Sequence, residues 1–287
     1  MKLLLVLLAL LLGWLFGGVL RNLKHRLVAS WYGLLMKPDS AVWWPIGLAL
    51  IPGLLTAALW FFLEDQGQYL LAALWSLAAL VFAWGSRDLD ADVARYLQAE
   101  DDAAREAAGA RFVFSYRHAD AAGACQAGMV EGVFYEGLVR WFGTLFWFLL
   151  AGPGGAVSYR FLQILLGDEE NRSRASEPQI GLLRRFVALV NWPPAVLASA
   201  ALAVVGDFDR VLRSSRELVA EHGWLNLDRD VWPRLGALTA RSVRDEAFSH
   251  EFSGELGQVD MAMNLVWRVL VSWLTVVALV TVGFALA

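Results

Sequence analysis

The chain has 287 residues, of which 58% are hydrophobic and only 18% are charged, against about 25% charged residues in a typical soluble domain. This composition and the net charge of −4 exclude a disordered chain, an ordinary secreted domain and a nucleic-acid-binding domain. The single cysteine, Cys125, excludes an intrachain disulfide framework. Because the apolar residues fall into long runs, the sequence predicts an all-α, polytopic integral membrane protein with about four to six membrane segments.

Residues 1–86 are predicted to form three membrane helices. The first, 3–20, carries no charge and is followed by a basic flank, which favours a retained helix over a signal peptide. The second, 43–63, has aromatic residues at both ends, as a bilayer interface selects, and Pro52 near its middle predicts a kink. The third, 69–84, follows a short polar loop, so we expect a helical hairpin.

Two polar regions, 87–128 and 207–262, are predicted to be helical and cytoplasmic. Charged residues of both signs crowd residues 87–120, and apolar residues recur there at helical spacing, which predicts one amphipathic helix. The residues of this stripe are Leu89, Val93, Tyr96 and Leu97. The cytoplasmic assignment follows the distribution of Lys and Arg, which is the quantity that sets orientation in membranes.

Residues 129–206 are predicted to enter the membrane with interruptions. The motif Gly152-Pro153-Gly154-Gly155 ends an apolar run, and residues 156–166 beyond it are too few to span, so we expect a re-entrant or interfacial return. Asn191-Trp192-Pro193-Pro194 is expected to break the next run, either lining a binding site or forming a short interfacial hairpin. The number of complete crossings here stays open.

The chain is expected to close with a membrane helix over 263–287. Five polar residues in or near the preceding membrane segments are candidate ligand-binding residues, because such residues face protein or water rather than lipid. They are Glu136, Arg140, Tyr159, Arg160 and Asn191. The structural alternative is a buried ion pair from the four-residue spacing of the first two, an interfacial anchor and a helix cap.

Metal-binding and catalytic signals are weak. Glu246 and His250 are four residues apart and Asp168 opens an acidic cluster, but neither pattern is specific for a metal. No phosphate-binding loop or nucleophile motif is present in the sequence. We therefore predict no catalytic residue, no metal and no cofactor.

Three segments in order and spacing resemble a family of membrane proteins. They are residues 96–105 (YLQAEDDAAR), 146–160 (FWFLLAGPGGAVSYR) and 190–195 (VNWPPA). Together they resemble the superfamily that joins the CobD/CbiB-type membrane synthases of cobalamin biosynthesis with AmpE, an inner-membrane protein linked to β-lactamase induction. The resemblance covers about residues 87–206.

Departures from the synthase pattern favour the AmpE branch. Where the synthases carry an Asn-Thr-Leu-Asp-like tetrad, this chain has QILL at 163–166, and Val187 and Ala188 stand where they carry two Asp. Apolar side chains cannot hold Mg²⁺ or contact phosphates. The resemblance therefore implies a signalling or regulatory protein of the bacterial inner membrane that modulates β-lactamase induction in response to cell-wall status, by binding.

Two alternatives stay open. The first is a divergent synthase that uses ATP and Mg²⁺ to form an amide or phosphate ester and draws its acids from Asp168, Glu169 or Glu170. The second is a small-molecule transporter, although few charged residues lie inside the spans to mark a pathway. The expected partners are the lipid bilayer and a cytoplasmic or membrane protein. Small-residue helix faces permit a homo-oligomer without specifying one.

Overall fold

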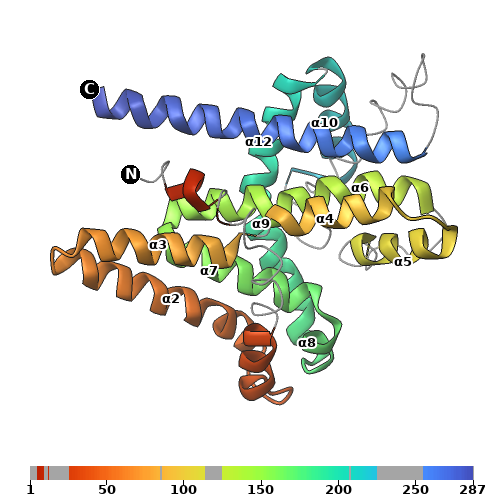
Figure 1. Cartoon of the computed structure of the whole chain (residues 1–287). Coiled ribbons are helices and arrows are strands. Elements are labelled where there is room, and N and C mark those ends of the chain that lie inside the picture. Colours follow the sequence, from red (N-terminus) through yellow and green to blue (C-terminus); the bar gives the residue numbers. More distant parts are fainter. Residues whose placement is uncertain are drawn as a thin grey trace. The chain divides into compact units, whose positions relative to one another are not determined.

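The computed structural model describes residues 5–9, 12, 26–84, 86–113, 125–206, 208–224 and 255–286, and every element among them is a helix (Figure 1). Four stretches are long and apolar enough to cross a membrane: Trp44–Asp65, Gly132–Gly167, Glu177–Val205 and Gly257–Leu279. The prediction of an all-α, polytopic membrane protein is therefore confirmed. Most of the predicted helix over 3–20 lies outside the described residues, as do residues 114–124 and 225–254.

The chain forms two compact units, each with its own packing. Unit 1 comprises Met1–Asp88 and Gly143–Val190, and unit 2 comprises Leu89–Phe142 and Asn191–Ala287. Both units therefore draw on segments that are distant in the sequence. Each is described separately below.

Unit 1 is an apolar helical cluster. It contains helical residues 26–35, α2 (Trp44–Asp65), α3 (Tyr69–Ala83), α7 (Gly143–Gly167), α8 (Glu169–Ser173) and the first half of α9 (Glu177–Val205). Its core is formed by apolar side chains from five of these elements, among them Tyr32, Leu48, Ala79, Phe161, Leu165 and Val187. Because α2 and α3 both pack against α7, the α7 segment is the centre of the unit.

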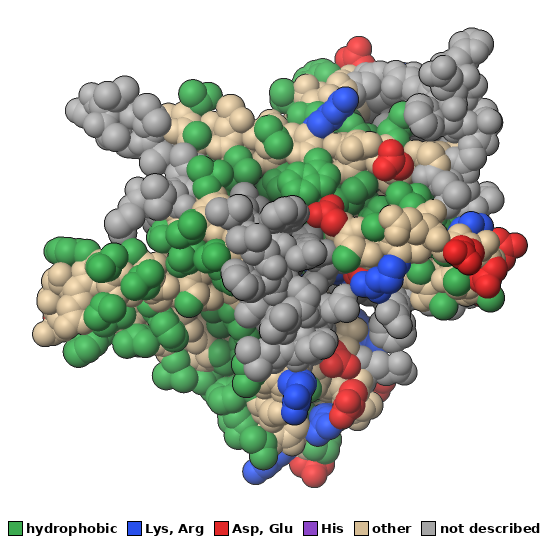
Figure 2. All heavy atoms as spheres, viewed as in Figure 1, with side chains coloured by type: hydrophobic (Ala, Val, Ile, Leu, Met, Phe, Trp, Pro, Cys, Tyr) green, Lys and Arg blue, Asp and Glu red, His purple; other side chains and the backbone are tan. Residues whose placement is uncertain are grey.

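Helices α2 and α3 form the predicted hairpin. A turn at Gln66–Gln68 joins them, and they pack against one another. With 15 residues, α3 rises only about 22 Å, which is less than the roughly 30 Å of bilayer hydrocarbon, so the predicted third span is shorter than a full crossing. Apolar side chains cover this part of the surface, whereas charged side chains gather around α8 (Figure 2).

The α7 segment is a helical hairpin that folds back at Gly152. Gly152 has φ 69°, a backbone conformation that favours glycine, and it interrupts the helical dihedrals. A Cβ added to Gly143 would overlap the Tyr159 hydroxyl, and one on Gly155 would come within 2.6 Å of the Trp147 carbonyl oxygen. Sixteen residues of straight helix would separate Gly143 from Tyr159 by about 24 Å. The break and return expected at Gly152 are therefore present.

Small residues let the second arm of this hairpin approach α2 closely. A Cβ on Gly154 would meet the Gly53 carbonyl oxygen at 2.5 Å and the Ala57 Cβ at 2.7 Å, and one on Gly53 would overlap the Ser158 hydroxyl. Both helices thus present small residues four positions apart, which is the pattern that lets membrane helices pack backbone to backbone. This crossing holds the hairpin tip against α2.

Tryptophan side chains of unit 1 donate hydrogen bonds to backbone carbonyls that have lost their amide partner because of a proline in the helix. A proline lacks the N–H that would bond the carbonyl four residues earlier. Pro52 therefore releases the Leu48 carbonyl, and the Trp31 indole N–H donates to it at 3.0 Å. Pro194 likewise releases the Val190 carbonyl in α9, which accepts from the Trp147 indole at 3.2 Å.

The predicted break at Asn191-Trp192-Pro193-Pro194 is wrong, because α9 continues as one helix from Glu177 to Val205. The expectation that the released carbonyls need protein partners is correct for Val190. Trp147 supplies a donor for one of the two carbonyls that the prolines leave without an amide partner, and the helix is continuous where local sequence predicts an interruption.

Unit 2 contains the polar helices. They are α4 (Ser86–Leu97), α5 (Asp102–Val113), α6 (Cys125–Gly137), the π-helix η1 (Leu138–Phe142), the second half of α9, α10 (Phe208–His222) and α12 (Glu255–Leu286). The single amphipathic helix predicted for residues 87–120 is thus two helices, separated at residues 98–101. Leu89, Val93 and Tyr96 are buried, as their stripe predicts.

Replacing Gly53 with alanine should lower the free energy of unfolding by about 1–3 kcal/mol, because the new methyl group overlaps Ser158 and the backbone of the hairpin. Unfolding in detergent with increasing denaturant measures the change. Gly181→Ala is the matched control, since nothing lies within 4 Å of its added Cβ and it is also helical. That control should be neutral or slightly stabilising. Equal effects of the two substitutions would contradict the close crossing.

Trp147→Phe should lower the free energy of unfolding by about 1–3 kcal/mol, because the Val190 carbonyl loses its donor. Pro194→Ala restores a backbone N–H at the position that normally bonds this carbonyl. The Trp147→Phe change should therefore be less damaging when combined with Pro194→Ala than alone, by about 1 kcal/mol in a double-mutant cycle. Strictly additive effects would show that the indole N–H does not substitute for the missing amide.

Candidate functional site: a buried ion-pair cluster in unit 2

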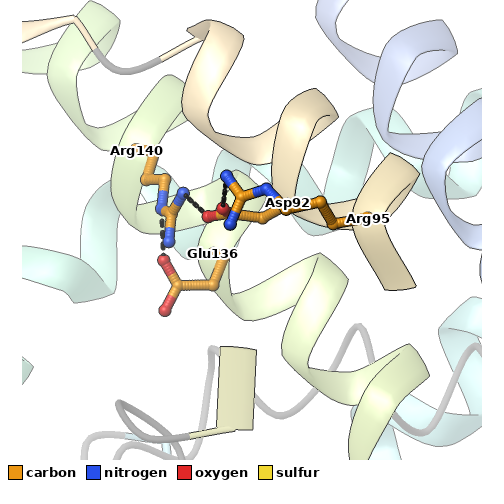
Figure 3. Close-up of polar contacts among 4 residues, drawn as sticks. All are labelled: Asp92, Arg95, Glu136 and Arg140. Atoms are coloured by element: carbon orange, nitrogen blue, oxygen red, sulfur yellow. Dashed lines mark hydrogen bonds and ion pairs between the residues drawn. The ribbon is translucent and has the colours of Figure 1, made fainter. Parts of the chain in front are cut away.

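Four charged side chains form an ion-pair cluster between α4 and the α6–η1 segment (Figure 3). Arg140 lies at the centre: its Nε donates to Glu136 Oε2 at 2.5 Å, and its Nη1 donates to Asp92 Oδ2 at 2.9 Å. Arg95 Nη2 contacts the other oxygen of Asp92 at 2.9 Å. The four residues are hereafter the Arg140 cluster.

The Arg140 cluster is largely shielded from solvent, and Glu136 is its buried member. The side chains of Glu136, Arg140 and Asp92 are 4%, 15% and 14% exposed, and only Arg95, at 42%, reaches solvent to a large extent. Taking charges out of water is expensive unless they are paired. The bonds of Arg140 to two carboxylates are therefore a requirement for placing it in an apolar segment.

Arg140 belongs to a π-helical stretch. Residues Leu138–Phe142 form η1, directly after α6 and directly before α7. Short π-helical segments are rare and are found frequently at functional sites, where the wider turn alters the direction of the side chains. The segment that carries the central cation of the cluster is thus irregular.

Two tryptophan side chains of unit 2 connect α12 to η1 and α4. Trp141 is fully buried and packs against Trp267 of α12, with ring centroids 4.8 Å apart and the ring planes tilted by 58°. The Trp267 indole donates to Asp90 Oδ1 of α4 at 3.1 Å. Burial raises the pKa of Asp90 above its ordinary value, and this hydrogen bond opposes the rise. Helix α12 therefore has a polar contact with the helix that supplies Asp92.

The structure groups the candidate residues in two sets. Glu136 and Arg140 form the ion pair that their four-residue spacing allows, and Asn191, fully buried in α9, also belongs to unit 2. Tyr159 and Arg160 are buried in unit 1, on the second arm of the α7 hairpin.

Asp92 and Arg95 are missed by sequence reasoning. They lie more than forty residues before Arg140, and no local pattern joins them. One signal does exist, because Asp92 stands three residues after Leu89 and four before Tyr96, on the buried face of α4. An acid on an apolar stripe predicts a buried partner.

The weak metal candidates differ in what can be said of them. Asp168 caps the N-terminus of α8, accepting from the Glu170 backbone N–H at 3.1 Å and from the Asn171 side chain at 3.0 Å. Glu246 and His250 lie outside the described residues. Within the part of the chain that the structure describes, no three metal-ligating side chains are grouped.

Comparisons with known proteins do not place the chain: no family model, no curated protein and no solved structure matches it. The class of protein defined by its fold is a multi-pass, all-α membrane protein. Any finer assignment is a proposal from the residues themselves.

Arg140→Met should lower the free energy of unfolding by about 3–5 kcal/mol, because it leaves two buried carboxylates without their shared cation. The loss should be partly recovered in Arg140→Met/Glu136→Leu, in which one of these charges is also removed. The matched control is Arg174→Met, which breaks an exposed pair of the same four-residue spacing with Glu170 and should change stability by less than about 1 kcal/mol. Chemical denaturation in detergent measures all three. A small effect of Arg140→Met would show that the cluster is solvated.

Proposed function

We propose that this chain is a regulatory protein of the AmpE type, located in the bacterial inner membrane, which acts by binding rather than by catalysis. One observation carries the proposal: Arg140, in an apolar segment, bonds at once to Glu136 of the adjoining helix turn and to Asp92 of the polar helix α4. The three ordered motifs that resemble AmpE and its superfamily support the choice of family.

The cluster offers a physical route for a signal. Arg140 has two partners, and only one of them, Asp92, lies on the polar helix. A ligand or a neighbouring protein that competes with Asp92 for Arg140 would weaken the bond to Asp92 and release α4. A regulator of this kind needs only a differential affinity for the two arrangements. We propose that α4, α5 and the polar region 207–262 are cytoplasmic and contact a protein partner.

The synthase alternative has less support. It needs acids that can bind Mg²⁺, and two of its three candidates have other roles. Asp168 is the N-cap of α8, and Glu170 is paired with Arg174 at 2.7 Å on the surface. A carboxylate that caps a helix has few lone pairs left for a metal ion. Binding is therefore the function that the geometry supports best.

The experiment is complementation in a bacterium with an inducible chromosomal β-lactamase and a deletion of its AmpE-type gene. Expression of this chain should restore the induced level of β-lactamase after exposure to a β-lactam. Asp92→Asn, which weakens the link between α4 and Arg140, should alter that level several-fold. Glu170→Gln, which removes an exposed charge, should not. Protein levels in the membrane fraction are measured in each strain.

Absence of any effect of the wild-type chain on induction would refute the regulatory proposal. Calorimetry with the purified protein then separates the alternatives, because a synthase should bind ATP tightly only with Mg²⁺ present. We expect no binding at millimolar nucleotide. Mg²⁺-dependent binding that is lost in Arg160→Ala would establish the synthase alternative instead.

A further inference from the structure

One oxygen of the Glu136 carboxylate is buried without a hydrogen-bond donor. Oε2 accepts from Arg140, whereas Oε1 has no partner among the described residues, and the residue is only 3% exposed. The second oxygen points away from Arg140 (Figure 3). An ionised carboxylate accepts hydrogen bonds at both oxygens, and a buried charged acceptor that lacks a donor is costly. Oε1 is thus a free acceptor whose position is fixed by the ion pair between Oε2 and Arg140.

Glu136 shares its guanidinium with a second carboxylate. Arg140 bonds to both Glu136 and Asp92, whereas Arg95 contacts Asp92 and is much more exposed. The positive charge of Arg140 is therefore divided between two acids, and the low dielectric around Glu136 strengthens the attraction of its carboxylate for a further cation.

We propose that Glu136 Oε1 is the binding position for the ammonium group of a small amine. A cationic N–H group supplies the missing donor and adds positive charge beside a carboxylate that shares its guanidinium, through a charge-assisted hydrogen bond to one oxygen. Ca²⁺ and Mg²⁺ instead require six or more oxygen ligands in a shell around the ion. The proposal names the ligand class for the regulatory protein described above, and it rests on the chain acting by binding.

Binding at this oxygen would act on the rest of the cluster. Glu136 shares Arg140 with Asp92, so an ammonium group on Oε1 reduces the pull of Glu136 on the guanidinium and strengthens the bond between Arg140 and Asp92. The amine therefore favours the arrangement in which α4 is held to η1. Its absence favours release of α4.

The test is thermal unfolding of the full-length protein in detergent, titrated with methylammonium chloride at constant ionic strength. Tetramethylammonium chloride is the matched probe, because it carries the same charge without an N–H donor. Methylammonium should raise the unfolding midpoint by about 5 °C or more at a hundredfold excess over its Kd. Tetramethylammonium should have little effect.

Two variants assign the effect to Glu136. Glu136→Gln should abolish the methylammonium shift, whereas Glu170→Gln, which alters an exposed acid with the same spacing to an arginine, should retain it. Because Glu136→Gln itself lowers the unfolding midpoint, methylammonium binding is also followed by tryptophan fluorescence at a temperature well below that midpoint. Trp141, five residues from Glu136, is one of the 14 tryptophans that contribute to this signal.

Three results would overturn the inference. They are equal shifts from the two ammonium ions, a methylammonium shift that persists in Glu136→Gln, and stronger stabilisation by Mg²⁺ or Ca²⁺ than by methylammonium. Each leaves the regulatory proposal intact if induction is still restored. Conversely, an amine response that depends on Glu136 would stand even if the chain has no effect on β-lactamase induction.

Discussion

A helix inside a bilayer has to satisfy every backbone carbonyl from within the protein, and in unit 1 this requirement decides which helices lie together. Pro52 and Pro194 each release one carbonyl, and each carbonyl is bonded by the indole of a tryptophan from another segment. The two bonds join the helical residues 26–35 to α2 and α7 to α9. The abundance of tryptophan in the chain therefore has a structural use beyond anchoring at the membrane surface.

In unit 2 the group that needs partners is a charged side chain. Arg140 lies in an apolar segment, so its guanidinium needs carboxylates, and one of them has to come from a different element. Asp92 on α4 supplies it. The exposed Glu170–Arg174 pair has the same spacing as Glu136–Arg140, but water surrounds it, so it places no such demand on the fold. The low exposure of Arg140, rather than the pairing itself, requires α4 and η1 to lie together.

Local chemistry explains which features were predictable. The Glu136–Arg140 pair follows from helical spacing, and the return at Gly152 follows from a helix-breaking motif. The break at Pro193-Pro194 was predicted from the same kind of signal and is wrong: α9 is continuous, and Trp147 donates to the carbonyl that Pro194 releases. Asp92 was missed because it lies 48 residues from Arg140. Local sequence patterns therefore predict helix breaks and ion pairs correctly only where no side chain from a distant segment bonds to the groups involved.

The sequence by itself determined the class of protein, the positions of most helices and the presence of a charged pair in an apolar segment. These depend on hydropathy and on a 3.6-residue period, which are properties of neighbouring residues. Only the tertiary structure decided that α7 folds back against α2, that α9 stays whole through two prolines and that Asp92 completes the ion pairs of Arg140. The first depends on small residues that are distant in the sequence, and the other two depend on a distant group that meets an otherwise unsatisfied polar or charged atom.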